Sequence, residues 1–140
     1  MNRLVNMFKG TQGTFIGLIL LVAFFSIFNP YFFQIRNFVN IFDQCTVLGV
    51  MALGMTAVII IGGIDLSVGS ILALAMMMTG WVWKDFGVPL HYACLLGLFV
   101  GTLAGSINGM LVSYLRLPAF IATLAMLSAA RGLANIFTDG

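Results

Sequence analysis

The amino-acid sequence predicts an all-α fold, a polytopic bundle of transmembrane helices. Hydrophobic residues make up 61% of the 140 positions and charged residues only 7%, whereas soluble domains have about half their residues apolar and about a quarter charged. Stretches without a charged residue run over residues 10–35, 44–64, 66–83 and 86–115. Each is close to or above the roughly 18 to 20 residues that cross a bilayer core as a helix, so we expect four membrane spans.

A fifth apolar stretch, residues 117–137, contains Arg131 and is a weaker candidate for a span. The boundaries between segments are marked by prolines at the ends of apolar runs, where the missing N–H does least harm. These are Pro30, Pro89 and Pro118. No linker rich in serine, proline or charge divides the chain, so we expect one transmembrane domain over residues 1–140.

The N-terminal segment has the pattern of a membrane anchor. Arg3 and Lys9 precede an apolar run at residues 15–32, and no small-x-small cleavage site follows that run. The pattern predicts an uncleaved anchor, and the basic residues favour a cytoplasmic N-terminus. Alternation across the membrane then places the loop at Lys84–Asp85 in the periplasm. Asn37 is expected to cap the second helix at its N-terminus.

The fourth span carries a stripe of glycines. The sequence GLFVGTLAGSING places them four residues apart on one face of a helix. They are Gly97, Gly101, Gly105 and Gly109. Because small residues at this spacing let a neighbouring backbone approach closely, tight helix packing is the simpler interpretation. A glycine face that lines a pore is the alternative.

The stretch IIIGGIDLSVGSILAL interrupts an apolar run with two glycines and a carboxylate. Gly62 and Gly63 permit backbone angles that end a helix. Asp65 is placed to cap the next helix through the N–H of Ser67 or Val68. The residues therefore predict a broken helix at Gly62–Asp65. Because transporters place such breaks at their substrate sites, Asp65 and Ser67 are also candidates for a polar substrate path.

Two further polar residues lie within apolar segments. Asn108 lies in the glycine-rich span, and a buried amide there more often bridges two helices than binds a substrate. Arg131 lies in the fifth apolar stretch, where a guanidinium must snorkel, pair with another group or face water. We therefore keep Asn108 and Arg131 as candidates for the substrate path.

Several classes of function are not supported by the sequence. The net charge is +2 and the basic residues are scattered, so no nucleic-acid partner is expected. Cys45 and Cys94 are isolated and are interpreted as small buried hydrophobes. There is no nucleophile-base-acid set, no HExxH zinc motif and no P-loop. We expect no catalytic site, no metal site and no cofactor on this chain.

Three blocks of the sequence resemble, in order and spacing, a known protein family. They are FNPYFFQIRNFVNIFDQ, LGMTAVIIIGGIDLSVGSILAL and NGMLVSYLRLPAFIATLAMLSAARGLA. The chain is similar to the N-terminal part of permease subunits of bacterial monosaccharide ABC importers of the ribose type, in which GGIDLSVG is a specific motif. The resemblance implies that residues 1–140 are part of a longer, multi-pass permease of the bacterial inner membrane.

The same resemblance implies partners. Two permease subunits would form the path for a monosaccharide such as ribose, a separate ATPase subunit would hydrolyse ATP, and a periplasmic sugar-binding protein would deliver the sugar. The chain itself would then not be an enzyme. Two alternatives remain. An ion-coupled secondary transporter also uses broken helices, but Asp65 is the only credible carboxylate within the membrane. The other alternative is a truncated membrane fragment that does not transport.

Overall fold

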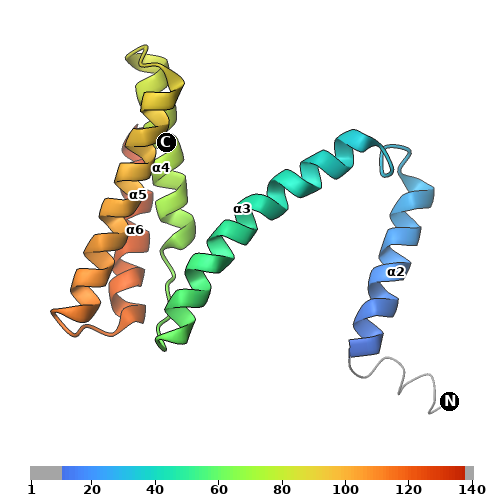
Figure 1. The fold of residues 1–140 in the computed structure, drawn as a ribbon, viewed down its shortest axis with the longest axis horizontal. Coiled ribbons are helices and arrows are strands. Elements are labelled where there is room, and N and C mark those ends of the chain that lie inside the picture. Colours follow the sequence, from blue (N-terminus) through green and yellow to red (C-terminus); the bar gives the residue numbers. More distant parts are fainter. Residues whose placement is uncertain (1–10, 138–140) are drawn as a thin grey trace. The chain divides into compact units, whose positions relative to one another are not determined.

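The computed structural model describes residues 11–137. Within this range the chain forms helices α2 (Thr11–Phe28), α3 (Ile35–Ile60), α4 (Val68–Asp85), α5 (Leu90–Ser113) and α6 (Ala119–Phe137) (Figure 1). No strand occurs among the described residues, and the predicted all-α fold is confirmed. Arg3 and Lys9 lie outside this range, so the uncleaved anchor and the cytoplasmic N-terminus stay predictions.

The chain divides into two compact units, Met1–Val50 and Met51–Gly140, and the long helix α3 contributes to both. The prediction of one transmembrane domain over residues 1–140 stays a prediction. All the contacts that build the candidate site described below lie in the second unit.

The start of α3 differs from the sequence-based expectation. The helix begins at Ile35, so Asn37 lies inside it, and the prediction that Asn37 is the N-cap was wrong. The helix starts earlier because the carbonyl of Gln34 already accepts the N–H of Asn37 at 2.9 Å. The side-chain Nδ2 of Asn37 instead donates to the carbonyl of Phe32 at 2.8 Å and fixes the turn before the helix.

In the second unit, α4 packs against both α5 and α6, and the three helices run side by side (Figure 1). Most of the buried residues in this unit have small side chains, which lets the helix backbones approach closely. The buried hydrophobic residues are Leu74, Ala93, Ala104, Ala122, Ala130 and Ala134.

Cys45 and Cys94 are exposed on their helices, so the interpretation of these residues as buried hydrophobes was wrong for the described part of the chain.

Three of the described helices are long and apolar enough to cross a membrane by length and composition: α3, α5 and α6. The expectation of four spans therefore changes for three helices, α6, α4 and α2. Helix α6 qualifies although it contains Arg131. Helix α4 does not, because its 18 residues end in Lys84 and Asp85, which lower the mean hydropathy. The apolar part of α2, Gly13–Phe28, is shorter than these three.

The predicted break in the helix is confirmed between the end of α3 at Ile60 and the start of α4 at Val68. Gly62 has a φ of +76°, a left-handed conformation that glycine adopts without steric cost. Gly63 meets a different requirement, because a Cβ there would lie 3.1 Å from Cγ1 of Val58. The first glycine thus permits the turn, and the second leaves room for the preceding helix.

Candidate functional site

Asp65 holds the segment that leads into α4. Its Oδ1 accepts hydrogen bonds from the backbone N–H of Ser67 at 2.7 Å and from the hydroxyl of Ser67 at 2.6 Å. Ser67 is 0% exposed and is the N-cap residue of α4, although its own side chain caps no N–H group. The predicted hydrogen bond from the N–H of Ser67 to Asp65 is confirmed, but the N-cap residue of α4 is Ser67 and not Asp65.

Asn108 connects this turn to α5. Its Nδ2 donates to Oγ of Ser67 at 2.8 Å, although the two residues are 41 positions apart. Because the Ser67 hydroxyl gives its only hydrogen to Asp65, it can only accept from Asn108, which fixes the orientation of the amide. The side chains of Asp65, Ser67 and Asn108 thus form one continuous hydrogen-bond network between the break and α5.

The other end of the Asn108 amide has no partner within residues 11–137. Asn108 is 6% exposed, and its Oδ1 is buried without a hydrogen bond. A buried acceptor of this kind costs about 1–3 kcal/mol when it is left unsatisfied.

Thr123 connects the break to α6, and sequence reasoning missed it. Its Oγ1 lies 2.8 Å from the carbonyl of Ala119 in its own helix and 3.2 Å from the carbonyl of Ile64 in the break. Thr123 is 4% exposed. Nothing in the sequence distinguishes it, because threonines elsewhere in the described helices bond the carbonyl four residues before them in the same way. Examples are Thr46, Thr56, Thr79 and Thr102.

The break borders a cavity of about 380 Å³ between the end of α3, the break itself, α5 and α6. The residues that line it are Val58, Ile61, Gly62, Gly63, Ile64, Asp65, Gly105, Asn108, Gly109, Val112, Ser113, Ala119 and Thr123. Asp65 is half-buried and is the only charged residue in this lining. We call this space the break cavity.

The glycine stripe of α5 divides into two parts with different surroundings. A Cβ at Gly97 would collide with Oγ1 of Thr79, and a Cβ at Gly101 would make ordinary contacts with α4. At Gly105 and Gly109, by contrast, a Cβ would meet nothing within 4 Å. One end of the stripe therefore packs against α4, and the other end lines the break cavity.

The depth of the break cavity follows from its position along the helices. Asn108 lies five residues before the end of α5, and Thr123 lies four residues after the start of α6. At about 1.5 Å per residue, both are within about 8 Å of the turn that joins the two helices. The cavity is therefore nearer to one end of the spans than to their middle. In the predicted topology that end is cytoplasmic.

Arg131 lies away from the break cavity. It is exposed on α6, eight residues beyond Thr123, and does not line the cavity. The structure therefore brings Asp65, Ser67 and Asn108 together but does not bring Arg131 to them. No group of three or more His, Cys, Asp or Glu residues that could hold a metal ion occurs among the residues that the structure describes.

Comparison with known proteins identifies the family. Residues 37–140 match the family described as the permease component of branched-chain amino acid transport systems. This match covers more than half of the chain and includes the break, α5 and α6. The chain belongs to this permease family. No solved structure matches the permease chain.

Individual relatives give a finer comparison. The permease chain is 43% identical over 129 residues to the ribose import permease protein RbsC of Haemophilus influenzae, covering 92% of the chain and 40% of that relative. It is 44% identical over 128 residues to the protein of the same name from Bacillus subtilis, covering 91% and 39%. It is 38% identical over 130 residues to the autoinducer 2 import system permease protein LsrC of Yersinia pestis, covering 92% and 37%.

The predicted resemblance to permease subunits of the ribose type is confirmed by these matches. The family is that of a transport component and not of an enzyme. The permease chain spans about two fifths of the length of the curated relatives that it matches.

Proposed function

We propose that this chain forms part of the translocation path of a permease subunit in an ATP-driven importer of a monosaccharide such as ribose. In this proposal the permease is a multi-pass protein of the bacterial inner membrane. It works with a second permease subunit, an ABC ATPase subunit and a periplasmic sugar-binding protein. The chain carries no cofactor, because the partner subunit binds and hydrolyses the ATP.

The observation that carries the proposal is the break cavity and the hydrogen bonds that hold its wall. Irregular backbone between membrane helices needs partners for its polar groups, and neighbouring helices or a polar cavity can supply them. Here Asn108 and Thr123 tie the break to α5 and α6, and about 380 Å³ of space lies beside it. Transporters use broken helices in this way to expose polar groups to their substrates.

The chemistry of the lining supports a neutral, hydroxylated substrate. No lysine, arginine or histidine lines the break cavity, so the carboxylate of an amino acid would find no cationic side chain there. The one carboxylate, Asp65, already accepts two hydrogen bonds from Ser67. The remaining polar groups are amides, hydroxyls and backbone carbonyls, which suit the hydroxyl groups of a sugar.

The same lining supports ATP as the energy source. A secondary transporter that moves protons or sodium ions usually needs carboxylates within the membrane that are free to bind the ion. Asp65 is the only carboxylate in the break cavity, and its Oδ1 accepts both hydrogen bonds from Ser67 at the start of α4. Energy supplied by a separate ATPase subunit fits this arrangement better.

The proposal is tested with a chimeric permease. Residues of the ribose import permease of Haemophilus influenzae that match this chain are replaced by this chain, and labelled ribose uptake is measured in cells without their own ribose permease. The unmodified relative is the positive control. We expect uptake that requires ATP and the partner ATPase. Uptake driven by a proton or sodium gradient would support the secondary transporter, and no uptake at normal membrane abundance would support a fragment that does not transport.

A further inference from the structure

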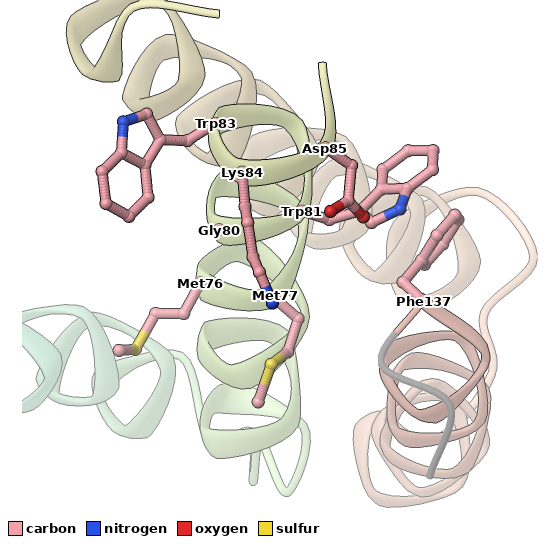
Figure 2. Close-up of a pocket in the computed structure, with 8 residues that line it drawn as sticks. All are labelled: Met76, Met77, Gly80, Trp81, Trp83, Lys84, Asp85 and Phe137. Carbon is pink, nitrogen blue, oxygen red and sulfur yellow. The ribbon is translucent and has the colours of Figure 1, made fainter. Parts of the chain in front are cut away.

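A second cavity lies at the other end of α4. It has a volume of about 470 Å³ and is formed by the last turns of α4 together with the end of α6 (Figure 2). The residues that line it are Met76, Met77, Gly80, Trp81, Trp83, Lys84, Asp85 and Phe137. We call it the interfacial cavity. It shares no residue with the break cavity.

The end of α4 that lines the interfacial cavity has the residue pattern of a membrane interface. The last five residues of α4 contain Trp81 and Trp83 followed by Lys84 and Asp85. Tryptophan and charged residues in this order are typical of the depth at which lipid headgroups lie.

Both signs of charge face this cavity. Lys84 and Asp85 both line it, and no ion pair is formed by either within residues 11–137. Figure 2 shows the Lys84 side chain running back along α4 towards Met77, while the Asp85 side chain extends from α4 on the side from which Trp81 extends. The cation and the anion are therefore presented at separate places of the same cavity.

The lower wall of the cavity is apolar and open. Met76 and Met77 are exposed, and at Gly80 a Cβ would meet nothing within 4 Å. Methionine side chains are flexible and adapt to irregular apolar partners. The absence of a side chain at Gly80 leaves a shallow groove in this wall of the cavity, and an acyl chain could lie in it.

The aromatic residues give this site a fixed wall. The Trp81 ring packs between Phe86 and Phe137, with ring centroids 4.9 Å apart in both pairs. Trp83, which extends from the other side of α4 (Figure 2), is 54% exposed. An indole ring combines an apolar face with one N–H donor, which suits the boundary between a phosphate group and an acyl chain.

From this arrangement we propose that the interfacial cavity binds a phospholipid whose headgroup carries both a phosphate and a primary ammonium, such as phosphatidylethanolamine. Lys84 pairs with the phosphate, Asp85 accepts hydrogen bonds from the ammonium, and the groove at Gly80 takes the upper part of an acyl chain. An anionic phospholipid satisfies Lys84 but is repelled by Asp85. The proposal does not depend on the proposed function, because it concerns only α4, α6 and the membrane.

The chain itself supplies the reporter for the test, because Trp81 and Trp83 are its only two tryptophans. The full chain is reconstituted in vesicles of phosphatidylcholine, and phosphatidylethanolamine or phosphatidylglycerol with brominated acyl chains is added in steps. Bromine quenches tryptophan fluorescence on contact. We expect phosphatidylethanolamine to reach half-maximal quenching at a mole fraction about fivefold lower than phosphatidylglycerol, the ratio that one favourable charge near a membrane surface gives.

Three variants complete the test. Asp85→Asn removes the partner of the ammonium and is expected to abolish the preference for phosphatidylethanolamine. Lys84→Gln is expected to weaken quenching by both lipids. Asp43→Asn changes an exposed carboxylate that does not line the cavity and is expected to keep the preference. Equal quenching by the two lipids in the unmodified chain, a preference for phosphatidylglycerol, or no quenching by either would overturn the proposal.

Discussion

Replacement of Asp65 by alanine or by asparagine separates hydrogen bonding from charge at the break. Oδ1 of Asp65 accepts both the N–H and the hydroxyl hydrogen of Ser67, at 2.7 and 2.6 Å. An asparagine side chain keeps an oxygen at the same position and can accept both bonds. Alanine removes the acceptor for both. We therefore expect the two substitutions to differ strongly in stability, although both remove the negative charge.

The magnitude follows from the burial of Ser67. Loss of a side-chain acceptor at a helix start typically costs about 1 kcal/mol. The hydroxyl of Ser67, which is 0% exposed, would in addition lose its only acceptor, and a buried donor without a partner costs about 1–3 kcal/mol. We expect Asp65→Ala to lower the free energy of unfolding by about 2–4 kcal/mol and Asp65→Asn to lower it by less than about 1 kcal/mol.

The assay is unfolding of the purified full chain in mixed micelles, followed by far-ultraviolet circular dichroism. Asn108→Ala is measured alone and together with Asp65→Ala, because both side chains act on the Ser67 hydroxyl and the two effects should not add. If Asp65→Asn is as destabilising as Asp65→Ala, the charge and not the hydrogen bonding maintains the break. If Asp65→Ala leaves the stability unchanged, the turn does not depend on Asp65.

Three further predictions concern packing, backbone strain and topology. Gly97→Ala is expected to lower the free energy of unfolding in the same assay, because its Cβ collides with α4. Gly105→Ala places its Cβ in open space and should change the free energy of unfolding little. Equal effects of the two substitutions would contradict the division of the glycine stripe. Arg116 has a φ of +54°, so Arg116→Gly should raise the free energy of unfolding by about 1 kcal/mol, and a loss of stability would show that the arginine side chain outweighs the strain. A cysteine that replaces Asp85 in a cysteine-free background should react with a membrane-impermeant thiol reagent in intact cells whose outer membrane admits the reagent. Labelling only after lysis would reverse the predicted orientation.

Local contacts within the candidate site could be predicted from the sequence. Asp65 and Ser67 are two residues apart, and a carboxylate two residues before a helix start is placed to accept a backbone N–H. The two glycines before Asp65 also predicted the break from local information, because the conformational freedom of glycine is a property of the residue itself. These features depend on the neighbouring few residues and on nothing distant.

Contacts between helices could not be predicted in the same way. Asn108 reaches Ser67 across 41 positions, and the sequence indicated only that its amide would need partners. Thr123 was missed because its bond to its own helix hides the second carbonyl, that of Ile64, from any local pattern. The equal spacing of the glycines likewise predicts that they share one face of α5. It does not predict where along that face the neighbouring helix α4 stops being in contact. That point decides which glycines pack and which line the break cavity.

The central claim is that the break cavity is part of the substrate path. It is tested most directly by filling the cavity in the chimeric permease and measuring ribose uptake at matched membrane abundance. Gly105→Leu puts a large apolar side chain into the cavity from a position without close neighbours, and Gly132→Leu puts the same side chain at an equally open position on α6 that does not line it. The account predicts that Gly105→Leu abolishes uptake and that Gly132→Leu leaves it intact. Uptake that survives Gly105→Leu unchanged would contradict it.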